Sequence, residues 1–266
     1  DGARLRVFEV AGAGTKTGRG EASPTSSAAV TIVYAHGFTL SAQSWCFQVD
    51  ALRGEARVAR QLIPDLRGHA GSAGGDEAGQ TKVELGVDLT ARDFVQMIRE
   101  FAPGEKIVLV GHSLGVMTVL GALRHMTDAE RQLVQGIVLA NGAVDPFALR
   151  GLPRLLHLLP IRTMRAVGRN TPRFAEGFKG KVEWLIKPVI AAAVYYSSLE
   201  HGKSARYDVV DFHAQEIEDL PMRTILGYLD DLTNHDERDC VPFLKHIPGV
   251  ILAGNNDAVA TVEQSR

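Results

Sequence analysis

Short apolar runs separated by longer amphipathic stretches characterise the chain up to residue 146 and recur near its end. Residues 29–35 (AVTIVYA), 136–140 (GIVLA) and 249–253 (GVILA) are almost continuously apolar and rich in β-branched side chains. Strands of a parallel sheet are covered on both faces, so such runs predict buried strands. Residues 4–10 alternate partly between apolar and polar side chains, which predicts a half-exposed strand. Two further strands are expected at 57–63 and 106–110.

Between these runs, apolar residues recur at helical spacing. Residues 41–52 place Trp45, Val49 and Leu52 on one face, and 83–101 form a long amphipathic pattern that ends at Pro103-Gly104. Shorter helices are expected at 116–123, at about 128–134 and at 241–245. Strands that alternate with helices predict an α/β fold with a mainly parallel central sheet and right-handed crossovers.

This alternation stops after Asp145-Pro146. Residues 147–231 carry mostly helical patterns and no buried strand of the earlier kind. About eighty helical residues between two core strands are typical of an inserted lid or cap. We therefore expect an α/β core formed by 1–146 and 232–266, with a helical cap at 147–231. The stretch 11–28, rich in Gly, Ser, Thr and Ala, is expected to be a surface loop.

Composition narrows the function classes. The chain has 266 residues, of which 45% are hydrophobic and 23% charged, as in globular proteins. A net charge of −2 gives no reason to expect nucleic acid or an anionic membrane as a partner. No apolar run reaches the roughly 18 residues of a membrane span, and no signal peptide is visible, so a cytoplasmic location is expected. Cys46 and Cys240 are expected to be buried free thiols. No metal-ligand spacing and no phosphate-binding glycine loop is present, so neither a metal nor a cofactor is expected.

The most informative motif is G-x-S-x-G at residues 111–115 (GHSLG). It follows the predicted strand 106–110 and precedes the helical segment 116–123. In this context a sharp, strained turn exposes the serine hydroxyl, and glycines on either side allow strand and helix to approach closely. Ser113 is therefore the candidate nucleophile. The N–H of Leu114, at the start of the helix, can point at a developing oxyanion.

A second candidate piece is His36-Gly37-Phe38, directly after the strand 29–35. If the strands 29–35 and 106–110 are neighbours, a backbone N–H of this segment lies beside the sharp turn at 111–115, which we call the elbow. Phe38 is therefore the candidate second oxyanion donor. With Trp45, the run 65–72 (DLRGHAGS), the elbow and 253–257 (AGNND), the chain resembles the α/β-hydrolase family of the helically capped kind. The motifs occur in the order typical of that family, and the resemblance covers nearly the whole chain.

The resemblance implies a serine hydrolase in which Ser113 attacks an acyl carbonyl, a histidine takes its proton and an acid orients that histidine. Asp257, after the strand 249–253, stands where the family's acid usually stands, and Asp145 is the alternative. The family's pattern gives His36, Gly37, Gly111 and Gly115 structural roles at the site. It also implies that Asp65 and Arg67 pin a loop, that His112 packs away from substrate and that His69 is not the base.

One feature departs from the family order of nucleophile, acid and histidine. All nine histidines precede Asp257, and none follows it. Three explanations stay open: the catalytic histidine lies beyond Arg266, another histidine substitutes, with His235 and His246 nearest the last strand, or the chain is a non-catalytic binding protein. The first predicts an enzyme that cleaves a carboxylic ester or related acyl bond of a small hydrophobic substrate under the cap. Carbon–carbon bond hydrolases and peroxidase-like relatives share the scaffold and stay possible.

Overall fold

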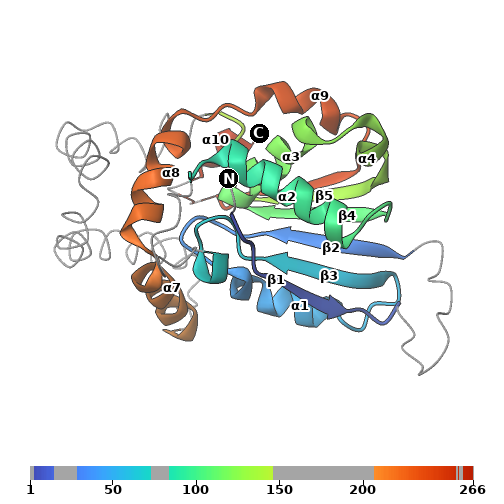
Figure 1. The fold of residues 1–266 in the computed structure, drawn as a ribbon, viewed down its shortest axis with the longest axis horizontal. Helices are drawn as coiled ribbons and strands as arrows, with labels where there is room; N and C mark the ends of the chain where they lie inside the picture. The colour runs from blue at the N-terminus through green and yellow to red at the C-terminus, as the bar shows by residue number, and fades with distance from the viewer. Residues whose placement is uncertain are drawn as a thin grey trace.

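Six strands form a single sheet in the order β1-β3-β2-β4-β5-β6 (Figure 1). This computed structural model describes residues 3–14, 29–72, 84–145, 207–255, 257 and 260–265. Antiparallel pairing is confined to β1 with β3, and the other neighbours are parallel. The predicted mainly parallel sheet is therefore confirmed. The strands are β1 (Val7–Ala11), β2 (Val30–Ala35), β3 (Val58–Pro64), β4 (Ile107–His112), β5 (Val134–Ala140) and β6 (Gly249–Leu252).

Helices connect and cover these strands. The described α-helices are α1 (Cys46–Leu52), α2 (Val87–Phe101), α3 (Leu114–His125), α4 (Asp128–Leu133), α7 (Tyr207–Asp219), α8 (Met222–Asn234), α9 (Val241–Leu244) and α10 (Val262–Ser265). Short 3-10 turns occur at Ala42–Trp45, Ala70–Ser72 and Arg238–Cys240. In this part of the chain, no helix is long and apolar enough to cross a membrane.

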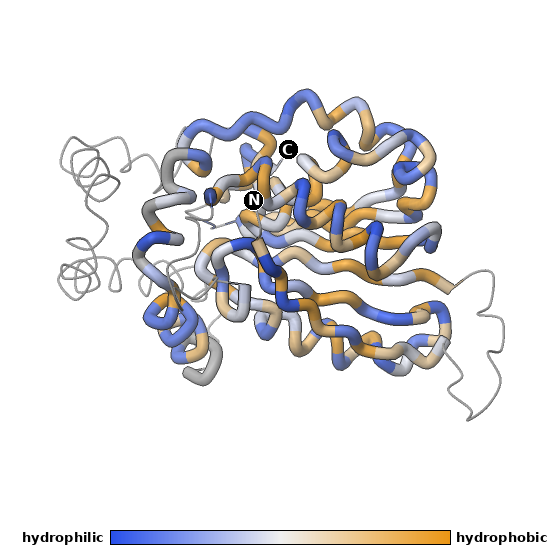
Figure 2. Tube along the Cα trace, in the orientation of Figure 1, coloured by the Kyte–Doolittle hydropathy of each residue, from blue (hydrophilic) through white to orange (hydrophobic). Residues whose placement is uncertain are grey.

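The alternation of side chains along β2 divides the core into two layers. Val33 and Ala35 pack with α2 and α3 in the larger cluster, whereas Ile32 and Tyr34 pack with Trp45 and α1 on the opposite face. The central strands are consequently apolar along most of their length (Figure 2). Burial on both faces is what their continuous apolar sequence predicts. Figure 1 shows α2 and α3 side by side over the sheet.

Two expectations about local features are wrong. The helix expected from residue 83 begins at Val87, because the Asp231 carboxylate accepts a hydrogen bond from the Val87 N–H (2.8 Å) at the helix start. A Cβ on Gly86 would lie 2.6 Å from the same carboxylate oxygen, so the chain enters this helix through glycine. Cys240 is buried as expected, but Cys46 is exposed at the start of α1.

A third expectation is wrong, because the strand expected to be buried at 249–253 is β6, which lies at the edge of the sheet and is exposed along its whole length. Val250, Ile251 and Leu252 are each more than half exposed. Of the predicted cap, residues 147–206 lie outside the described part of the chain, and the remainder contains α7 and α8. The boundaries of the cap stay a prediction.

Candidate active site

Ser113 occupies a sharp turn between β4 and α3. Its φ and ψ angles are 52° and −113°. A positive φ is uncommon for a residue with a side chain and costs roughly 1–3 kcal/mol unless the surroundings hold it. The Ser113 N–H donates to the Ala140 carbonyl (3.0 Å), and the Ser113 carbonyl accepts from the Val116 N–H (2.9 Å). The backbone on both sides of the serine is thus fixed by the neighbouring strand β5 and by the first turn of α3.

The two glycines that flank the turn are required by contact with the backbone. A Cβ at Gly111 would lie 2.5 Å from the Gly115 carbonyl oxygen, and one at Gly115 would lie 1.9 Å from the Ala35 carbonyl oxygen. Both distances are shorter than real Cβ contacts allow. The close approach of strand and helix on which the motif depends is therefore present, and it involves β2 as well as β4.

The loop after β2 lies beside this turn, because β2 and β4 are neighbours with Ala35 paired to Gly111. It contains His36, Gly37, Phe38 and Thr39, and Thr39 also has a positive φ of 67°. The His36 ring is fully buried; its Nδ1 donates to the Gly37 carbonyl (2.8 Å), and its Nε2 accepts from the Leu66 N–H (2.8 Å). Burial holds the pKa of His36 well below its usual value, so the ring is neutral and structural.

His112 packs under the same loop. A Cβ on Gly37 would lie 2.7 Å from its Nδ1, so glycine is needed there as well. The His112 and Trp45 rings form a T-shaped pair with their centroids 6.5 Å apart. Burial lowers the pKa of His112, the charge of Asp257 raises it, and that of His213 on α7 lowers it. Asp257 therefore lies within electrostatic reach of the elbow.

The two candidate acids have different surroundings. Asp257 follows β6, donates its N–H to the Gly254 carbonyl (3.2 Å) and accepts at Oδ1 from the Ala260 N–H (2.9 Å). Asp145 instead accepts from Gln264 Nε2 (3.4 Å) and acts electrostatically on His235. Asp257 thus acts electrostatically on His112, next to Ser113, whereas Asp145 acts on His235.

The loop 65–72 has the structural contacts expected of it. Asp65 is completely buried, and its carboxylate accepts from Arg6 Nε (2.6 Å), the Ala42 N–H (2.9 Å) and the Gly71 N–H (3.0 Å). Arg67 forms a bidentate pair with Asp93 on α2 (2.7 and 2.8 Å). These charge-assisted bonds join β1, the loop after β2 and α2 around the turn that carries the candidate oxyanion donor.

His69 belongs to the same buried group. Its Nδ1 donates to the Arg67 carbonyl (2.9 Å), and its Nε2 accepts a long hydrogen bond from the Thr39 N–H (3.4 Å). Burial lowers its pKa to about 4. With both ring nitrogens engaged in the backbone, His69 is placed to support the loop and not to act as a base.

Sequence reasoning missed the contributions of α7 and α8. Glu216 on α7 forms a side-chain hydrogen bond with Ser41, and burial raises its pKa. His213 is three residues away on the same helix and acts electrostatically on His112. Tyr228 on α8 is fully buried and packs against Phe38 and His69, with ring centroids 5.9 and 5.4 Å apart. No motif marks these residues, because their contacts depend on how the helices fold back onto the core.

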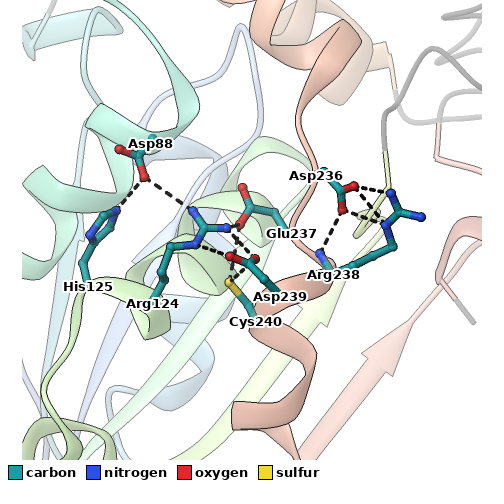
Figure 3. A network of polar contacts seen from close by, with 8 residues as sticks. All are labelled: Asp88, Arg124, His125, Asp236, Glu237, Arg238, Asp239 and Cys240. Carbon is teal, nitrogen blue, oxygen red and sulfur yellow. Dashed lines mark hydrogen bonds and ion pairs between the residues drawn. The ribbon is translucent and has the colours of Figure 1, made fainter.

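A polar network at the far end of α3 was also missed (Figure 3). Arg124 binds Glu237 (2.5 Å), Asp239 (2.8 and 2.9 Å) and, more distantly, Asp88 (3.4 Å), and His125 Nε2 lies 2.6 Å from Asp88. The ligand atoms of Glu237, Asp239 and Cys240 lie within 4.8 Å of one another, a spacing that could hold a metal ion. However, the guanidinium already binds both carboxylates, and burial strongly raises the pKa of the thiol. These three side chains are therefore better suited to binding the Arg124 guanidinium than to holding a metal ion.

Comparison with known proteins agrees with this architecture. Among solved structures, the chain is similar to a thermophilic esterase from Thermogutta terrifontis (20% identity, 98% of this chain and 78% of that chain, TM-score 0.64). It is also similar to an esterase from Exiguobacterium antarcticum (15%, 98% and 81%, TM-score 0.66) and to a bromoperoxidase from Bacillus anthracis (18%, 97% and 80%, TM-score 0.63). No curated protein matched the sequence. The family model described as "Alpha/beta hydrolase family" matches residues 32–263, and the chain therefore belongs to the alpha/beta hydrolase family.

Proposed function

We propose that the protein is a serine hydrolase that cleaves a carboxylic ester or related acyl bond through an acyl-enzyme on Ser113. The observation that carries the proposal is the strained turn at Ser113, with φ of 52°, between two glycines that no larger residue can replace without backbone overlap. Strain of this kind persists where the surroundings over-determine it, and it exposes the hydroxyl at the tip of the turn.

In the proposed reaction, Ser113 Oγ attacks the acyl carbon, its proton passes to a base and the carbonyl oxygen becomes an oxyanion. The N–H of Leu114 is an orphan donor of the first turn of α3, and the helix dipole adds positive potential at that end. The Phe38 N–H is the second proposed donor. Collapse of the tetrahedral intermediate releases the alcohol, and water then hydrolyses the acyl-enzyme.

The base in this proposal is a histidine oriented by Asp257. His36 and His69 are unsuited to act as the base, because each ring is buried and neutral, and both nitrogens of each ring are hydrogen-bonded to backbone groups. Neither of these two rings is therefore proposed as the base. The esterases among the similar structures support a small acyl substrate.

A fluorophosphonate probe tests the proposal directly. The protein should be labelled on Ser113, and Ser113→Ala should abolish labelling. Ser44→Ala provides the matched control, because Ser44 donates only to the Ser41 carbonyl (2.7 Å) and should leave labelling intact. Absence of labelling under conditions that modify a known esterase would contradict the mechanism and favour a binding protein.

A further inference from the structure

Helix α8 contacts the loop 65–72 through two buried hydroxyl groups. The Tyr228 hydroxyl donates to the Arg67 carbonyl (2.8 Å), and the Thr224 hydroxyl donates to the Gly68 carbonyl (2.8 Å). Gly68 has a positive φ of 77°, so α8 contacts the loop where its backbone turns. More than 150 residues of sequence separate these side chains from the loop, and the contact therefore joins the last helix of the predicted cap to the core.

Tyr228 also reaches the loop that carries the proposed oxyanion donor. Its ring contacts the Phe38 ring and the His69 ring, while His69 accepts the Thr39 N–H. The Arg67 carbonyl accepts from both Tyr228 and His69 Nδ1, so one acceptor joins the two side chains. Phe38 is thus packed against the rings of Tyr228 and His69, which are themselves held by hydrogen bonds.

The chemistry of the Tyr228 hydroxyl suits a permanent support. It forms a second hydrogen bond with the Thr90 hydroxyl on α2 (2.6 Å), and burial raises its pKa, so it stays neutral at physiological pH. Thr39, next to Phe38, holds a positive φ that needs support from its surroundings. Part of that support comes from His69, which accepts the Thr39 N–H and whose ring packs against the Tyr228 ring.

From these contacts we propose that Tyr228 is a positioning residue that holds Phe38, and with it the Phe38 N–H, in place. The position of the proposed oxyanion donor then depends on the packing of α8 against the core. This inference rests on the proposed function for its catalytic meaning. The positioning itself is a property of the fold and can be measured without turnover.

The test compares Tyr228→Phe, which keeps the ring and removes both hydrogen bonds, with Tyr34→Phe. Tyr34 is equally buried, and its hydroxyl donates to Gln61 (2.7 Å) on the opposite face of the sheet. Amide hydrogen exchange of the peptide 36–45 is the first readout. Tyr228→Phe should speed exchange at residues 37–40, whereas Tyr34→Phe should leave it unchanged at equal global stability.

Kinetics on a short-chain p-nitrophenyl ester give the second readout. Because small displacements of catalytic groups cost up to about 100-fold in rate, Tyr228→Phe should lower kcat roughly tenfold and leave KM within about twofold. Tyr228→Leu, which also removes the ring, should lower kcat further. Equal exchange in Tyr228→Phe and Tyr34→Phe would overturn the proposal. A wild-type protein without labelling or turnover would contradict the proposed function, and the exchange comparison would still decide the role of Tyr228.

Discussion

Gly115→Ala tests whether the elbow requires glycine for steric reasons. The added Cβ would lie 1.9 Å from the Ala35 carbonyl oxygen, which is 1.5 Å short of an ordinary van der Waals contact of 3.4 Å. The obstacle is backbone in the centre of the sheet, and so no side-chain rotation relieves it. Helix α3 must move away from β2 by about the missing distance, and we expect a loss of at least about 3 kcal/mol in the free energy of unfolding.

The same displacement moves Ser113 relative to the loop after β2. A shift of about 1 Å at a catalytic group can lower the rate roughly 100-fold, so labelling of Ser113 should slow by a similar factor in the fraction that stays folded. Urea unfolding followed by circular dichroism measures the first effect, and the second-order rate of fluorophosphonate labelling measures the other.

Gly54→Ala is the matched control. A Cβ at Gly54 meets no atom within 4 Å, and this glycine is not at a positive φ. Its replacement should leave labelling unchanged and stabilise the fold by up to about 1 kcal/mol through the unfolded state. If Gly115→Ala matched Gly54→Ala in both measurements, the steric reasoning for the elbow would be refuted.

Three further predictions concern other parts of the fold. Arg124→Leu leaves the buried Glu237 carboxylate without its cation and should lower the free energy of unfolding by about 3 kcal/mol at pH 8. The loss should be smaller at pH 5, because burial raises the pKa of Glu237 and favours its protonation, and urea titrations at both pH values measure the difference. His69, whose pKa falls to about 4 on folding, stabilises the protein fully above pH 6.5, and this contribution is lost as the pH falls towards 4. His69→Gln should flatten the dependence of unfolding free energy on pH in that window, and an unchanged slope would contradict it. Ile251→Lys should reduce concentration-dependent association of the 266-residue chain in light scattering, because the apolar edge of β6 is exposed, whereas Phe47→Lys on α1 should not.

Features that depend on neighbouring residues could be predicted from the sequence. The elbow is one, since Gly111, Ser113 and Gly115 impose their geometry within five positions. The positions of the strands are another, because continuous apolar runs are typical of a sheet covered on both faces; their burial is correct for the central strands but not for β6 at the edge. The pairing of β2 with β4, on which the placement of the loop after β2 depends, was only a condition at the sequence level and is shown by the fold.

Contacts between distant segments could not be predicted in this way. The start of α2 is set by Asp231, 144 residues later in the chain, and no local capping signal reveals it. Tyr228 reads as one more residue of an amphipathic helix, although it joins Arg67, Thr90 and Phe38 in the fold. The choice of Asp257 over Asp145 as the acid stays a prediction, although the fold shows that their surroundings differ.

Helix α3 is held at its two ends by different kinds of interaction, and the difference has consequences for mutation. Its first turn is packed against the backbone of β2, so changes there disturb the reactive geometry and the stability together. Its last turn lies about 16 Å away at 1.5 Å per residue and carries Arg124, whose positive charge suits the negative end of the helix dipole. That end is bound by carboxylates from α2 and from the segment before α9. Weakening this distant anchor should lower stability while the folded fraction keeps its labelling rate, because the close packing at Gly115 fixes Ser113 independently.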